Sequence, residues 1–97
     1  MATKQEIARE MLRIFDGKSE RWCQGRMFLC DGRGRPYARC LIGASMEAAD
    51  RLRCGGIGGE VDQAIAQKFG DPGAWNDAPE RTFAEVQALL LSIAEES

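Results

Sequence analysis

The sequence predicts a mainly α-helical protein, with an α+β arrangement as the alternative. Apolar residues recur at helical spacing in four segments, which is the primary signature of amphipathic helices. Two of these segments follow a Thr-x-x-Glu pattern, the spacing of a helix-initiating capping box. Between the first two segments the periodicity fails and turn-forming residues accumulate. We therefore expect about four helices, with one small hairpin or irregular loop between helices 1 and 2.

The length of the chain limits the number of domains that it can form. Ninety-seven residues suffice for a single small globular domain, residues 1–97, with one modest core. Only seven per cent of the residues are aromatic, so aliphatic and small side chains must fill most of that core.

The first helix is expected over about 4–16. Thr3 and Glu6 form the capping box that opens it, and Gly17 can adopt the left-handed conformation that ends it. Its inner face is made of Ile7, Met11, Ile14 and Phe15.

The hairpin is predicted from two short stretches. "RMFLC" (26–30) is apolar enough for one strand, and "DGRGRP" (31–36) is rich in turn formers. A second strand would be very short, near 35–37. Because isolated hairpins are only marginally stable in water, we expect this one to lie on the helices. Its candidate anchors are Trp22, Phe28 and Leu29.

The second helix is expected over about 38–52. Its apolar and small face comprises Leu41, Ile42, Ser45, Ala48, Ala49 and Leu52. Gly43 lies in its interior, where glycine costs about 1 kcal/mol relative to alanine. Close approach of another backbone or a bulky ring is the usual compensation, and we expect Trp75 to pack over Gly43 and Ala44.

The second half of the chain predicts two more helices. "CGGIGG" (54–59) is a flexible connector, and a helix follows over 60–69 and ends at Gly70. Its inward side chains are expected to be Val61, Ala64, Ile65 and Phe69. Turn chemistry then extends to Thr82, which forms the second capping box with Glu85 and opens a helix that runs to about residue 95. The inner face of that helix comprises Phe83, Val86, Leu89, Leu90 and Ile93.

The composition excludes several classes of protein. There is no signal-peptide pattern and no apolar run of about 20 residues, so we expect a cytoplasmic protein with no membrane segment. The four cysteines form no C-x-x-C pair and there is no histidine, so we expect free thiols, no metal site and no cofactor. The absence of histidine also removes the most common general base, which favours a non-enzymatic protein, and we assign no catalytic residue.

Charge is distributed unevenly along the chain. Residues 1–54 carry 11 Lys/Arg and 7 Asp/Glu, whereas residues 55–97 carry 2 and 8. Either the two halves fold onto each other and cancel, or the basic segment forms a local surface for anions. In the second case the candidate binding residues are Arg26, Arg33, Arg35 and Arg39.

The C-terminal part resembles a known sequence family. "AWNDAPERTFAEVQALL" (74–90) is similar to the C-terminal signature Trp-Asn-Asp-Ala-Pro-x-Arg-Thr of an uncharacterised family of small bacterial and phage proteins. The resemblance extends to Trp22, Gly25, "DGRGRP" and the helix with Cys40, Leu41, Gly43 and Ala44. Two departures are Glu80, where relatives often have glycine, and Arg39, where they often have an aromatic residue. The resemblance implies no activity and no catalytic residues.

The signature has a structural and a functional interpretation. In the structural one, Asn76 or Asp77 caps a short turn that contains Pro79, while Arg81 pairs with Asp77 or bonds to a loop carbonyl. Trp75 is then mostly buried. In the functional one, Asn76, Asp77 and Arg81 bind a ligand beside Trp75.

Two functional hypotheses follow. The first is a small non-enzymatic protein-interaction module, phage-encoded, that binds and inhibits a host immune-system protein. The alternative is a small-ligand or nucleotide-binding protein, in which Arg33 and Arg35 hold phosphates and Trp75 or Trp22 stacks on a base. The pI near 5 argues against a nucleic-acid partner. A homodimer through an apolar strip on the hairpin or the last helix is left open.

Overall fold

The computed structural model describes residues 3–53 and 59–96. Within these ranges it contains five α-helices, one 3-10 turn and one two-stranded antiparallel sheet. The elements in chain order are α1 (Lys4–Phe15), η1 (Ser19–Arg21), β1 (Phe28–Cys30), β2 (Pro36–Arg39), α2 (Leu41–Arg51), α3 (Gly59–Phe69), α4 (Pro72–Asp77) and α5 (Phe83–Ala94). The fold is therefore mostly helical with a small sheet, an α+β arrangement with one helix more than expected. The predicted connector lies outside the described residues, apart from Gly59.

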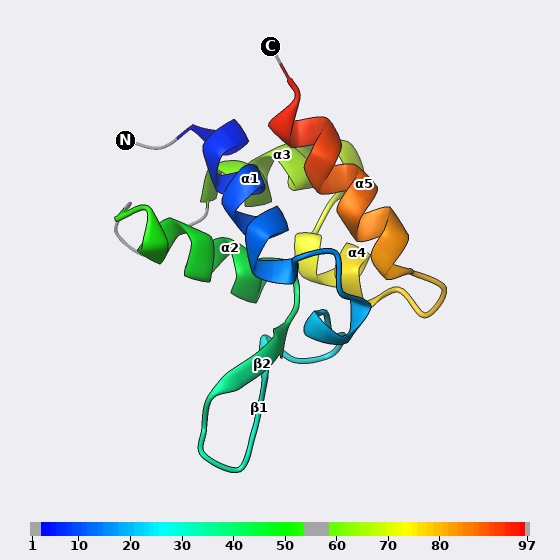
Figure 1. Ribbon diagram of the computed structural model, residues 1–97. Coiled ribbons are helices and arrows are strands. Elements are labelled where there is room, and N and C mark those ends of the chain that lie inside the picture. The colour runs from blue at the N-terminus through cyan, green and yellow to red at the C-terminus, as the bar shows by residue number, and fades with distance from the viewer. Residues whose placement is uncertain (1–2, 54–58, 97) are drawn as a thin grey trace.

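Two helices are opened by the predicted capping boxes. The Thr3 hydroxyl accepts the amide of Glu6 at the start of α1, and the Thr82 hydroxyl accepts the amide of Glu85 at the start of α5. α1 ends at Asp16 and Gly17, which both adopt left-handed backbone angles. The two helices lie alongside each other, and α1 also packs against α2 (Figure 1). None of the helices in the described ranges has the length and apolar character to cross a membrane.

The core lies between α1, α2, α3 and α5. Its largest fully buried side chains include Phe15, Met11, Leu41, Ile65 and Leu90. The prediction that Phe69 points inward is wrong, because this side chain is 52% exposed. It is the last residue of α3, and its ring packs against Trp75 of α4, with ring centroids 5.5 Å apart, instead of entering the core.

The second helix begins three residues later than expected. Ala38 and Arg39 belong to β2, where they pair with Leu29 and Phe28 of β1. Cys40 then caps α2, since its sulfur accepts the amide of Gly43 at 3.5 Å. Strand pairing extends the hairpin at the expense of the first predicted turn of the helix.

The hairpin extends away from the helices instead of lying on them (Figure 1). Trp22 packs against the core as predicted, but Phe28 and Leu29 are only half-buried and lie outside the core. The hairpin is attached at its base, where the Cys23 amide donates to the Arg39 carbonyl and the Cys40 amide donates to the Met27 carbonyl. Backbone hydrogen bonds at one end therefore take the place of Phe28 and Leu29 as anchors, whereas Trp22 keeps its expected role.

A short helix, α4, occupies a segment that the sequence predicted as turns. The Asp71 carboxylate accepts the amides of Gly73 at 2.8 Å and Ala74 at 3.4 Å, and Pro72 occupies the first turn. Asp and Pro in these positions are strong helix-start signals. The prediction was wrong because Asp, Pro and Gly also favour turns, so the segment was assigned to a loop.

Candidate functional site

The turn of the hairpin is closed by one carboxylate. Asp31 Oδ1 accepts the amide of Arg33 at 2.8 Å and the amide of Arg35 at 3.0 Å. Gly34 has a φ of +78°, which favours glycine, and its amide donates to the Asp31 carbonyl. The "DGRGR" sequence thus forms a defined turn, in which the acidic side chain is occupied by backbone donors.

The surface of the hairpin is basic and apolar. Arg26, Arg33 and Arg35 are all exposed. Two large apolar side chains accompany them: Met27 is 44% exposed and Tyr37 is 52% exposed. Three of the four arginines that were predicted as binding residues therefore lie on the exposed surface of the hairpin region.

The fourth arginine of that group is elsewhere. Arg39 is only 7% exposed, and its Nε donates to Glu47 Oε1 at 3.0 Å. Arg39 therefore places a charge in the protein interior, where it pairs with Glu47. Arg39 points to α2, whereas Arg33 and Arg35 lie in the hairpin turn.

The base of the hairpin is held by Asn76, the last but one residue of α4. Its side chain has no exposed surface and makes four hydrogen bonds. Oδ1 accepts the Trp22 indole N–H at 2.7 Å and the Leu41 amide at 3.1 Å, while Nδ2 donates to the Cys23 carbonyl at 3.1 Å and to Asp77 Oδ1 at 2.9 Å. This uses the full capacity of a side-chain amide.

Two neighbouring side chains extend the network. Asp77 Oδ1 also accepts the Gly25 amide at 2.9 Å. Gln24 Nε2 donates to the carbonyls of Asn76 and Ala78 at 2.9 and 2.8 Å. α4 is thereby joined to residues 22–25, which lead directly into β1. We call the side chains of Trp22, Gln24, Asn76 and Asp77 the polar junction.

The polar junction corrects the structural interpretation of the signature. Asn76 and Asp77 were expected to cap the turn that follows them, yet they bond to a segment about fifty residues earlier in the chain. The reason is spatial: α4 packs against α2, which brings its last residues to the segment that leads into the hairpin. Sequence spacing gave no signal for these long-range partners, and it missed Gln24 altogether.

Trp75 also lies in a different place from the one expected. It is half-buried, not mostly buried, and its ring carries the Arg81 guanidinium at 3.9 Å on one side. Arg81 Nε donates to the Trp75 carbonyl at 2.9 Å, which is the predicted carbonyl alternative, and Arg81 pairs with Glu85 instead of Asp77. Trp75 does not cover Gly43: a Cβ atom there would overlap the Met27 carbonyl oxygen. A close approach to Gly43 was predicted, by another backbone or by a bulky ring; the structure shows the backbone of Met27 there and not the expected ring of Trp75.

Burial raises the pKa of the Cys23 thiol, and the neighbouring Cys40 and Asp77 add to the effect. An activated cysteine nucleophile needs the opposite shift, since the thiolate is the reactive form. The thiol donates to the Arg26 carbonyl at 3.3 Å, so it takes part in fixing the segment before β1.

Comparison with known proteins gave one match. The model of a family of unknown function (DUF6197) matches residues 2–96. No curated protein and no solved structure matches the chain.

Proposed function

The chain belongs to the family of unknown function DUF6197, and we propose that it is a non-enzymatic protein-interaction module that presents its β1–β2 hairpin to a partner protein. One observation carries the proposal: a hairpin with exposed arginines and exposed large apolar side chains extends from the helical body, while its base is locked in place (Figure 1). Arginine, tyrosine and methionine are enriched at the centres of protein interfaces.

The hairpin is ordered before it meets a partner. Asp31 closes its turn, and the polar junction fixes the segment from which it starts. Side-chain and loop ordering opposes association, so a surface that is ordered in advance binds with a smaller loss of entropy. A two-stranded sheet that extends into solvent also gains stability from a partner that covers it.

The charge of the hairpin indicates the chemistry of that partner. Three exposed arginines face solvent, and the one acidic side chain in the turn already accepts two amides. An acidic surface with an apolar centre is complementary to this pattern and would also speed association. In the finer form of the proposal, the protein is phage-encoded and the partner is a host immune-system protein that it inhibits.

The alternative at the same loop, nucleotide binding by Arg33 and Arg35 with a tryptophan, has less support from the geometry. Arg33 and Arg35 lie in the turn of the hairpin, whereas Trp22 and Trp75 both pack against the core. The protein-interaction proposal uses the exposed arginines of the hairpin together with Met27 and Tyr37.

Capture and affinity measurements test the proposal. Tagged protein is used to recover partners from bacterial lysates, and each recovered partner is purified and its affinity measured. The double variant Arg33→Glu/Arg35→Glu and the variant Met27→Ser are expected to weaken binding at least tenfold, because each removes part of the interface. The matched control is Lys68→Ala, an exposed cation on α3, which should bind like wild type. Partners that bind all these variants equally well, or no stoichiometric partner in any lysate, would refute the proposal.

A further inference from the structure

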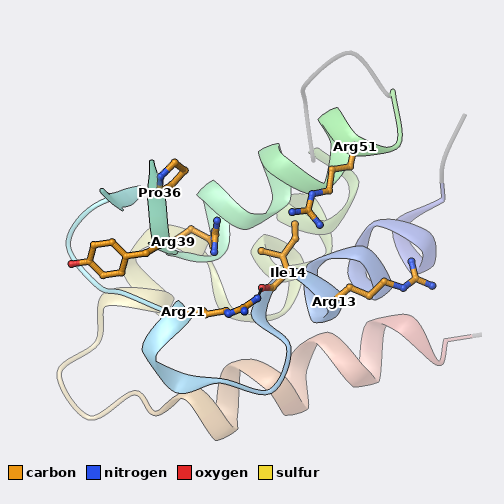
Figure 2. Close-up of a pocket in the computed structure, with 7 residues that line it drawn as sticks. Arg13, Ile14, Arg21, Pro36, Arg39 and Arg51 are labelled. Atoms are coloured by element: carbon orange, nitrogen blue, oxygen red, sulfur yellow. Dashed lines mark hydrogen bonds between the residues drawn. The ribbon is translucent and has the colours of Figure 1, made fainter. Parts of the chain in front are cut away.

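Four arginines from four different elements line one pocket of about 320 Å³. They come from α1, η1, β2 and α2, and their side chains are drawn in Figure 2. The lining residues are Arg13, Ile14, Arg21, Pro36, Tyr37, Arg39 and Arg51. We call this cavity the arginine pocket. Of its four arginines, the sequence singled out only Arg39 as a binding residue, because the others are spread over almost forty positions.

Arg39 is the central observation. A guanidinium has five N–H donors, and the bond from Nε to Glu47 uses one of them. Within residues 3–53 and 59–96, its two terminal amino groups have no protein acceptor, although the residue is more than nine-tenths buried. These terminal nitrogens are not themselves sealed from solvent, so their unused donors are available to an acceptor that enters the pocket. Through the arginine pocket, an acceptor can reach the terminal amino groups of Arg39.

Two more guanidinium groups lie beside it. Figure 2 shows the side-chain ends of Arg21, Arg39 and Arg51 around Ile14, whereas Arg13 extends away along α1. Arg21 donates to the Ile14 carbonyl at 3.2 Å, so its position is fixed by the end of α1. Arg51 pairs with Glu10 at 3.3 Å and with Glu47 at 3.0 Å. The cations are thus held in place by the protein itself.

The ion pairs leave an excess of positive charge. Among the described residues, Glu10 and Glu47 are the carboxylates that pair with the pocket arginines, so Arg21, Arg39 and Arg51 leave an excess of one positive charge, which becomes two when the exposed Arg13 is counted. A ligand with one to two negative charges would balance the site. Arginine donates pairs of parallel hydrogen bonds to phosphate oxygens, and a tetrahedral phosphoryl group can accept such pairs from several directions at once.

The size of the cavity limits which ligands can fit. A volume of about 320 Å³ stands at the lower end of small-molecule sites, which span roughly 300–1,000 Å³. From these observations we infer that the arginine pocket binds the phosphoryl dianion of a small phosphate compound. This site shares Tyr37 with the hairpin surface proposed to bind a protein partner, but Met27, Arg33 and Arg35, the residues changed in the test of that contact, are not among its lining residues.

Binding is tested with isotope-labelled full-length protein at constant, low ionic strength. The probes are inorganic phosphate, glycerol phosphate and, as a singly charged planar control, acetate. Both phosphates are expected to shift the arginine Nε–H resonances saturably below about 10 mM, a modest affinity on the usual scale. Acetate should be at least tenfold weaker. Tighter binding of glycerol phosphate than of phosphate indicates an organic ester as the ligand, and equal binding indicates the free anion.

Three variants locate the site. Arg39→Lys keeps the charge opposite Glu47 but loses the planar fork, and Arg21→Gln changes a partly exposed residue that the fold tolerates more easily. Each is expected to weaken phosphate binding about tenfold or more, since a charge-assisted bond is lost. Lys68→Gln on α3 is the matched control and should stay within twofold of wild type. If Arg39→Lys does not fold, Arg21→Gln decides. The inference is overturned by the lack of saturable shifts with phosphate, by equal binding of acetate, or by variants that bind like the control.

Discussion

Asn76 accepts a hydrogen bond of 2.7 Å from the indole N–H of Trp22, which lies 54 residues earlier in the chain. The same oxygen accepts the first amide of α2, so one buried side chain joins α4, the start of α2 and the segment before the hairpin. This bond is the centre of the polar junction and relates the signature near the C-terminus to the surface proposed to bind a partner.

Replacement of Asn76 by leucine is expected to destabilise the fold strongly. It would leave the Trp22 indole N–H, the Leu41 amide and the Cys23 carbonyl buried without their partner. Each such group costs about 1–3 kcal/mol, so the free energy of unfolding should fall by about 3 kcal/mol or more. Urea denaturation measures the change. Gln67→Ala, an exposed amide on α3, is the control and should alter stability by less than about 0.5 kcal/mol.

Gly43→Ala is expected to destabilise the protein although alanine is the better helix former. An added Cβ would overlap the Met27 carbonyl oxygen, which accepts the Cys40 amide. The strain of this overlap should exceed the gain of about 1 kcal/mol in helix propensity, for a net loss of about 1–3 kcal/mol. Gly32→Ala meets nothing within 4 Å and provides the matched substitution, with a change near zero. A Gly43→Ala protein that melts at a higher temperature than wild type would contradict the close approach.

The partly buried carboxyl of Asp62 is expected to make the folded state less stable as the pH rises. Burial raises the pKa of this carboxyl above its usual 3.8, and the hydrogen bond from the Ser45 hydroxyl offsets only part of the effect. A raised pKa in the folded state means that stability is lost as the pH rises from below 3.8 through the folded pKa. Asp62→Asn should therefore stabilise the protein at pH 7 and lose this advantage below pH 3.8. Glu60→Gln in the same helical turn controls for the helix dipole and should show a small loss instead.

The carboxyl of Glu85 is expected to have the opposite effect, because it makes the folded state less stable as the pH falls. Its hydrogen bonds from the Thr82 backbone, the Thr82 hydroxyl and Arg81 lower the pKa of its carboxyl below 4.5. The stabilisation is complete above pH 4.5 and disappears as the pH falls through the folded pKa. Glu85→Gln should thus be less stable than wild type at pH 7, and the difference should shrink toward pH 3. Urea midpoints at several pH values measure it. A difference that stays constant with pH would show that the capping box does not depend on charge.

Much of the helical framework could be predicted because its signals are local. The two capping boxes, the left-handed end of α1 and the inner faces of α1 and α5 depend on residues within four positions of one another. α4 was missed although its Asp-Pro start is also local, because the following glycine and the Asn-Asp pair resemble a loop. The start of α2 was missed for another reason: Ala38 and Arg39 suit either a helix or a strand, and pairing with β1 decides between them.

The candidate sites were harder to predict because they join distant residues. Trp75 and Asn76 are neighbours in sequence, yet the structure buries the polar one and leaves the aromatic one half-exposed under Arg81. Arg39 resembled its neighbours Arg33 and Arg35, but it is buried against Glu47 while they remain exposed.

By itself the sequence determined four of the five helices in the described residues, where α1 and α5 begin and that Gly43 must be closely approached by another group. These features arise from hydrogen bonds and side-chain spacing within single turns of the chain. Only the tertiary structure decided that Asn76 holds the base of the hairpin and that four arginines meet at one pocket. Such contacts depend on how helices pack through their apolar faces, and the polar side chains carried along by that packing leave no local signal in the sequence.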